Sequence, residues 1–193
     1  MSKAKTDTII REAMDAYQNN NAEEAFKLLN RALLKDLNNK DILNALGDFN
    51  YLSNNIMKAL DCWDKSLVIN PSQVDILFNA ALIHQQNNEH KKALELYSRL
   101  LAINPNDVES LNNRGNVNRK LSMYDKAIED YESALEKGFK TFEVFYNLAI
   151  SFDELNLYED AIHSYASALS LNPNVPEIYL NFTNSLTVLG RYE

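Results

Sequence analysis

The chain has 193 residues, a formal net charge of −8 and one cysteine, Cys62. The negative charge argues against a general affinity for nucleic acid or anionic membranes, and no apolar run approaches the roughly 20 residues that span a bilayer. The amino terminus lacks the apolar core of a signal peptide, and the single cysteine allows no internal disulfide, so we expect a cytoplasmic protein.

Alanine recurs along the chain at a fixed step of 34 residues. Such a period is typical of stacked supersecondary units and not of one folded-back globule. The recurring alanines, numbered here as position 20 of a repeat, are Ala25, Ala59, Ala93, Ala127 and Ala161. In this numbering the repeats begin near residues 6, 40, 74, 108, 142 and 176.

Each repeat carries the pattern of two helices joined by a turn. In the third repeat Val74, Leu77 and Ala81 fall on one helical stripe, and Ala93, Tyr97 and Leu100 form another after Asn87-Asn88. Position 15 holds residues that tolerate the left-handed conformation in which helices end, namely Asn20, Asn54, Asn88, Ser122, Asn156 and Gly190. Because no strand-like alternation competes, the sequence predicts an all-α fold.

Position 24 is large and mostly aromatic, whereas positions 8, 20 and 27 are mostly small, and Pro71, Pro105 and Pro173 stand at position 32. This pattern resembles the tetratricopeptide repeat family over residues 6–193. The resemblance implies a right-handed solenoid of helix-turn-helix units, with five full repeats and the first helix of a sixth, over residues 1–193 as a single domain. Position 7 departs from the family in Glu12 and Arg114, where an apolar residue is usual.

The last helix is expected over roughly residues 177–189, and Tyr192-Glu193 then occupies positions that open the second helix in earlier repeats. This ending predicts that the chain is the N-terminal fragment of a longer protein. The alternative is a natural terminus in which the last helix serves as a cap.

The residues that carry chemistry form no catalytic pattern. There is no Walker loop, GxSxG, CxxC or HExxH motif, and His84, His90 and His163 do not share a repeat position. Acidic pairs such as Glu23-Glu24 and Glu129-Asp130 are interpreted as solvated helix faces. We therefore expect no catalytic residue, cofactor or metal ion within this segment, and no enzyme activity of its own.

Position 6 is asparagine in four successive repeats, Asn79, Asn113, Asn147 and Asn181, and we call these residues the asparagine row. The family resemblance implies that position 6 lines a concave groove, and the row resembles the substrate-holding arm of O-linked N-acetylglucosamine transferases. An amide there can hold the N–H and C=O groups of an extended peptide. The alternative is a habit of the family without any ligand, because asparagine is abundant in this chain.

Position 2 is acidic in every repeat, and three of these acids, Asp75, Glu109 and Glu143, are candidate peptide contacts; the others are Asp7, Asp41 and Glu177. Carboxylates in a first helical turn are also explained by the helix dipole. By resemblance, chaperone-binding members place Lys at position 2, so an acidic partner is disfavoured. We expect a protein or peptide partner that is neutral or basic. In the fourth repeat Asn112, Asn116 and Arg119 are predicted to add a polar contact patch to the groove.

The leading interpretation is a protein–protein interaction scaffold that binds an extended peptide or partner segment in its concave groove. Two alternatives remain open. The segment is the substrate-recruiting arm of a larger enzyme, such as a glycosyltransferase, or it is a self-association module that forms a homo-oligomer through its open C-terminal end. Neither nucleic acid nor membrane is expected as a partner.

Overall fold

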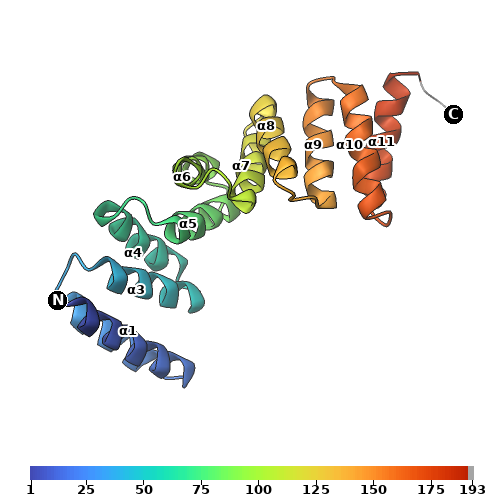
Figure 1. Cartoon of the computed structure of the whole chain (residues 1–193). Helices are drawn as coiled ribbons and strands as arrows, with labels where there is room; N and C mark the ends of the chain where they lie inside the picture. Colours follow the sequence, from blue (N-terminus) through green and yellow to red (C-terminus); the bar gives the residue numbers. More distant parts are fainter. Residues whose placement is uncertain (191–193) are drawn as a thin grey trace. The chain divides into compact units, whose positions relative to one another are not determined.

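The computed structural model describes residues 1–190, which contain eleven α-helices and no strand (Figure 1). The all-α prediction is confirmed. The expected start of a second helix at Tyr192-Glu193 lies outside the described residues. The helices are α1 (Lys3–Gln18), α2 (Ala22–Leu33), α3 (Lys40–Leu52), α4 (Ile56–Ile69), α5 (Val74–Gln86), α6 (His90–Ile103), α7 (Val108–Lys120), α8 (Tyr124–Glu136), α9 (Phe142–Glu154), α10 (Tyr158–Leu171) and α11 (Pro176–Val188).

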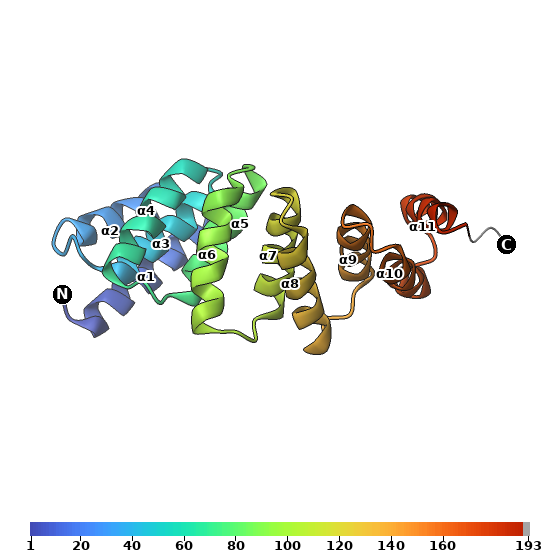
Figure 2. The ribbon, with the colours of Figure 1, turned by 90° about the horizontal axis from the view of Figure 1, so that it is seen from above.

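The chain divides into two compact units, Met1–Ile83 and His84–Glu193. In the first unit, α1 packs on α2 and α3 packs on α4 as the two helices of a repeat, and α1 also contacts α3. In the second unit, α7 pairs with α8 and α9 pairs with α10, and α11 follows against α10 (Figure 2). Here the first helices of successive repeats meet, since α9 contacts both α7 and α11. We call the surface that these odd-numbered helices build within each unit the first-helix face.

The turn within each repeat has the left-handed conformation that the sequence predicts. Asn20, Asn54, Asn88 and Asn156 each have a φ of 60°, and Ser122 has a φ of 57°. This conformation lets the following N–H group reach back to a carbonyl five residues earlier, as from Leu157 to Phe152 at 2.9 Å. The first helices of the first five repeats are thereby closed at their C-termini by the same hydrogen bond.

The core of each repeat consists of a buried alanine and a large side chain that packs on a small one. All five alanines at position 20 are fully buried, and so is Trp63, which is 1% exposed. Gly47 lies directly under Trp63, because a Cβ atom built on Gly47 would lie 2.2 Å from the indole Nε1. Small residues at position 8 therefore allow the two helices of a repeat to approach closely, as the sequence predicts.

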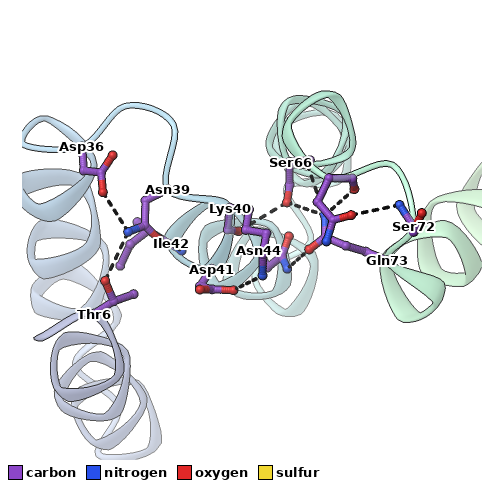
Figure 3. A network of polar contacts seen from close by, with 11 residues as sticks. Thr6, Asp36, Asn39, Lys40, Asp41, Ile42, Asn44, Ser66, Ser72 and Gln73 are labelled. Atoms are coloured by element: carbon purple, nitrogen blue, oxygen red, sulfur yellow. Dashed lines mark hydrogen bonds and ion pairs between the residues drawn. The ribbon is translucent and has the colours of Figure 1, made fainter. Parts of the chain in front are cut away.

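Polar side chains connect the repeats of the first unit near the starts of their first helices (Figure 3). Asn39 caps α3 by accepting a hydrogen bond from the Ile42 N–H at 3.2 Å, and its amide donates to Thr6 of α1 at 3.2 Å. One repeat later, Gln73 donates to the Ser66 hydroxyl at 2.9 Å and accepts a hydrogen bond from Asn44 at 2.9 Å. These contacts satisfy polar groups that the packing partly removes from water.

Candidate functional site

The asparagine row lies on the first helices, with its residues on α5, α7, α9 and α11, and all four side chains are half-buried. Asn113, Asn147 and Asn181 belong to the second unit and stand at equal positions of adjacent helices, so they share its first-helix face. Asn79 lies on α5 in the first unit. The four side chains are neither fully buried nor fully exposed, and each retains contact with solvent.

Asn147 is hydrogen-bonded to the preceding repeat. Its Nδ2 atom donates to Oδ1 of Asn116 at 3.0 Å, and the Tyr131 hydroxyl donates to the same oxygen at 2.9 Å. Burial raises the pKa of Tyr131 to about 12, although the positive charge of Arg119 acts in the opposite direction. The structure thus brings three of the predicted contact residues, Asn116, Asn147 and Arg119, into one polar cluster with a buried tyrosine.

The other asparagines of the second unit make the same kind of contact. Asn181 donates from Nδ2 to the Tyr146 hydroxyl of the preceding repeat at 3.0 Å. Burial raises the pKa of Tyr97 in the third repeat, and a hydrogen bond to Asn113 in the fourth opposes that shift. Asn113, Asn147 and Asn181 therefore each connect their repeat to the one before it, which is a structural role for these three residues in addition to any ligand contact.

Part of the hydrogen-bonding capacity of this face is unused. An asparagine side chain has two N–H donors and an oxygen with two lone pairs, and the contacts of Asn147 and Asn181 use one donor each. Within residues 1–190, Oδ1 of Asn112 and Nε of Arg119 are buried without any hydrogen-bond partner. Since buried polar groups are normally satisfied, these atoms are candidates for contact with water or a ligand.

The acidic residues of position 2 line the start of the first helices. Asp75, Glu109 and Glu143 are exposed and lie in the first turns of α5, α7 and α9, where they also meet the helix dipole favourably. Asp7 differs, because α1 begins at Lys3 and carries no acid in its first turn. The exposed carboxylates give the N-terminal edge of the first-helix face a negative charge.

One acidic residue interpreted as solvated is instead buried. Asp130 is 3% exposed and forms a bidentate ion pair with Arg114, whose Nη2 donates to Oδ1 at 2.6 Å and whose Nε donates to Oδ2 at 3.0 Å. Asn118 donates a further hydrogen bond to Oδ2 at 2.9 Å. Burial raises the pKa of Asp130, and the Arg114 charge opposes this. Arg114, the departure at position 7, is thus explained by an internal partner.

A cavity in the first unit has none of the ten predicted contact residues in its lining. It has a volume of about 850 Å³ in the first unit, between α2 and α4, with α3 beneath it. Phe26, Leu33 and Leu46 supply apolar lining, and Val68 at its edge is 85% exposed. This groove could not be predicted from the sequence, because its lining residues recur at no shared repeat position.

Within residues 1–190, no group of three or more His, Cys, Asp or Glu side chains is arranged to hold a metal ion. None of the helices in the described part of the chain has the length and apolar character needed to cross a membrane. The polar features described above are hydrogen-bonding amides, exposed acids and one buried ion pair, between Arg114 and Asp130.

Comparison with sequence families identifies three consecutive stretches of the chain. The tetratricopeptide repeat family matches residues 74–107, 108–137 and 142–175, whose starting residues are those of the third, fourth and fifth repeats. No curated protein matches the chain. The register deduced from the alanine period is therefore that of the family.

Several solved structures share the fold. YrrB, titled a TPR protein with an unusual peptide-binding site, is 20% identical with a TM-score of 0.79, over 89% of this chain and 88% of that one. A tetratricopeptide repeat protein from Parabacteroides merdae is 23% identical with a TM-score of 0.76, over 96% and 74%. MamA from Desulfovibrio magneticus is 16% identical with a TM-score of 0.74, over 90% and 97%. At these identities the similarity concerns the fold alone.

Proposed function

This chain belongs to the tetratricopeptide repeat family, and we propose that it binds extended segments of a partner protein on the first-helix face of each unit, at the members of the asparagine row that the unit carries. Repeats of this kind are scaffolds for protein–protein interaction, and the chain is such a scaffold and not a catalyst. Solenoid repeats present extended surfaces to which a partner segment can run parallel. The location that we propose is the cytosol, in keeping with the single cysteine.

The observation that carries the proposal is the unused hydrogen-bonding capacity of the row. Asn147 and Asn181 are held in place by bonds to Asn116 and Tyr146, and each retains one amide N–H and its oxygen for a ligand. A side chain fixed by a neighbour loses little rotamer freedom when a ligand binds. An extended backbone needs one donor and one acceptor per residue, and an amide supplies both.

The charge of the first-helix face supports a neutral or basic partner. Asp75, Glu109 and Glu143 are exposed along the start of the first helices, and the chain has a net charge of −8. Like charges repel, so an acidic segment would be disfavoured, whereas lysine or arginine side chains would be attracted. The binding should therefore weaken when salt is added.

The test begins with a selection of random displayed peptides on the full chain, followed by the dissociation constant of a selected peptide by fluorescence anisotropy. Asn181→Ala should weaken binding about tenfold, as expected for the loss of hydrogen bonds in a partly desolvated site. Tyr146→Phe is the matched control, because it removes the hydroxyl that holds Asn181 but leaves the amide in place. An equal loss of peptide affinity in both variants would count against the proposal. A selection that yields no binding peptide would also count against it.

Self-association is a second candidate function, favoured by the surface of α11. Tyr179, Leu180 and Val188 of this helix are 47%, 64% and 59% exposed. Exposed apolar side chains on one helix can bury surface against a second copy. The test is sedimentation over a range of concentrations, in which Leu180→Lys should abolish any dimer that the wild type forms; a monomeric wild type would exclude this function.

A further inference from the structure

A small cavity of about 230 Å³ opens in the first unit beside the first member of the asparagine row. Its lining includes Asp48 and Tyr51 of α3, Trp63 of α4, and Asn79 and Leu82 of α5. A single water needs only about 10–15 Å³ of such volume, whereas drug-sized ligands occupy about 300 Å³ or more. The cavity is therefore of a size for one side chain of a bound segment.

Asp48 gives this cavity a carboxylate without a cation. Its Oδ1 atom accepts a hydrogen bond from the Trp63 indole at 3.2 Å, and it forms no ion pair within residues 1–190. Burial raises the pKa of Asp48, and the negative charge of Asp75 raises it further. A cation placed beside Asp48 would relieve both effects, because it stabilises the ionised carboxylate.

The remaining surroundings suit a flat, extended cation. The rings of Tyr51 and Trp63 form one wall, with centroids 6.0 Å apart and planes inclined by 42°, and Tyr51 is 41% exposed. One turn before Asp48 on α3, and outside the lining of the cavity, the Asn44 amide donates to Gln73, while its buried Oδ1 has no partner among the described residues (Figure 3). Acceptors and aromatic faces thus predominate on this part of α3.

We propose that this cavity receives the guanidinium group of an arginine side chain from the bound segment. Asp48 would pair with the guanidinium, the Tyr51 ring would stack on it, and Leu82 would contact the aliphatic stem. Arginine is favoured over lysine because its planar group stacks on aromatic rings and forms two hydrogen bonds with a carboxylate. The proposal rests on the proposed peptide binding, since Asn79 of the row lines the same cavity.

The test uses Trp63, which is the one tryptophan of the chain and whose indole N–H lies in the cavity. The indole cross-peak of the ¹⁵N-labelled chain is followed while Nα-acetyl-arginine amide is added. Nα-acetyl-citrulline amide, which has nearly the same shape without the charge, is the matched control, and Nα-acetyl-lysine amide is a third probe. We expect a saturable shift with the arginine probe, and a shift at least several-fold weaker with the other two.

Asp48→Asn tests the role of the carboxylate, because the amide oxygen can still accept the Trp63 N–H. This variant should bind the arginine probe about tenfold more weakly while the thermal melting is unchanged. Absence of a saturable shift, or an equal response to citrulline, would overturn the proposal, and equal binding of the lysine probe would overturn the guanidinium assignment. Asn181→Ala should leave the Trp63 titration unchanged, so failure of the asparagine row and failure of this cavity are distinguishable.

Discussion

The side-chain amide of Asn147 reaches across a repeat boundary and donates to Oδ1 of Asn116 at 3.0 Å. The asparagine at position 6 is therefore part of the packing between repeats as well as part of the solvent-facing surface. One repeat later, Asn181 also donates to the preceding repeat, but its acceptor is the Tyr146 hydroxyl at position 5 of that repeat. Removal of such an asparagine is expected to affect both stability and binding, and the two effects must be measured separately.

The hydrogen bond between Asn147 and Asn116 should contribute to stability. We expect Asn147→Ala to lower the free energy of unfolding by about 1 kcal/mol relative to Asn184→Ala. Asn184 is an exposed residue of α11 and serves as the control, because its replacement brings the same gain in helix propensity without the loss of a contact between repeats. Urea unfolding of the two variants, followed by circular dichroism, provides the comparison. Identical unfolding midpoints would show that the contact between Asn147 and Asn116 contributes nothing to stability.

The two helical glycines at position 8 should respond differently to alanine. A Cβ atom at Gly47 would lie 2.2 Å from Trp63, whereas one at Gly115 would lie 2.7 Å from the Tyr131 ring. Repeats 3 and 5 combine alanine at this position with a tyrosine at position 24, so a tyrosine ring can accommodate the methyl group. We expect Gly47→Ala to cost about 1–3 kcal/mol and Gly115→Ala to be nearly neutral. Thermal melts of both variants check this, and an equal effect would contradict it.

Ser122 is the one non-asparagine among the five non-glycine residues with positive φ in the described chain. Asparagine tolerates the left-handed conformation better than serine does. Ser122→Asn should therefore raise the free energy of unfolding by about 0.5–1 kcal/mol, and the reciprocal Asn156→Ser should lower it by a similar amount. Chemical denaturation measures the free energy of unfolding of both variants. Changes of opposite sign would support this explanation, whereas two changes of the same sign would refute it.

The buried pair of Arg114 and Asp130 predicts a pH-dependent defect. Arg114→Leu leaves a buried carboxylate without its cation and should cost about 3 kcal/mol at neutral pH. Because burial raises the pKa of Asp130, the folded chain holds a proton there more tightly than the unfolded chain. Loss of Arg114 raises that pKa further, so the defect should shrink as the pH falls toward the ordinary value of 3.8.

The control for this pair is Arg114→Leu combined with Asp130→Leu, which removes both charges and should restore most of the stability. Urea unfolding of the single and double variants between neutral and acidic pH supplies the comparison. A single variant whose defect does not depend on pH would indicate that Asp130 is not the cause.

The features that depend on local geometry could be predicted from the sequence. The left-handed turns at Asn20 and Asn156 follow from the tolerance of asparagine for that conformation, and the close approach at Gly47 follows from a small residue facing a large one. Both are set within one repeat. The period of 34 residues then reproduces them along the chain.

Features that depend on the distance between residues of different helices could not be predicted from the sequence. The acidic pair Glu129-Asp130 predicts a solvated helix face, and only the packing of α7 on α8 brings Arg114 to Asp130. Likewise, a bond from position 6 to position 9 of the preceding repeat, as from Asn147 to Asn116, requires the offset between adjacent first helices.

The measurement that tests the central proposal most directly is a map of the side-chain amide cross-peaks of the ¹⁵N-labelled chain as a selected peptide is added. Binding along the asparagine row should shift the Nδ2 resonances of Asn113, Asn147 and Asn181, whereas Asn30 and Asn38, which line the groove between α2 and α4, should be unaffected. Shifts confined to Asn30 and Asn38 would place the ligand in that groove and would contradict binding on the first-helix face.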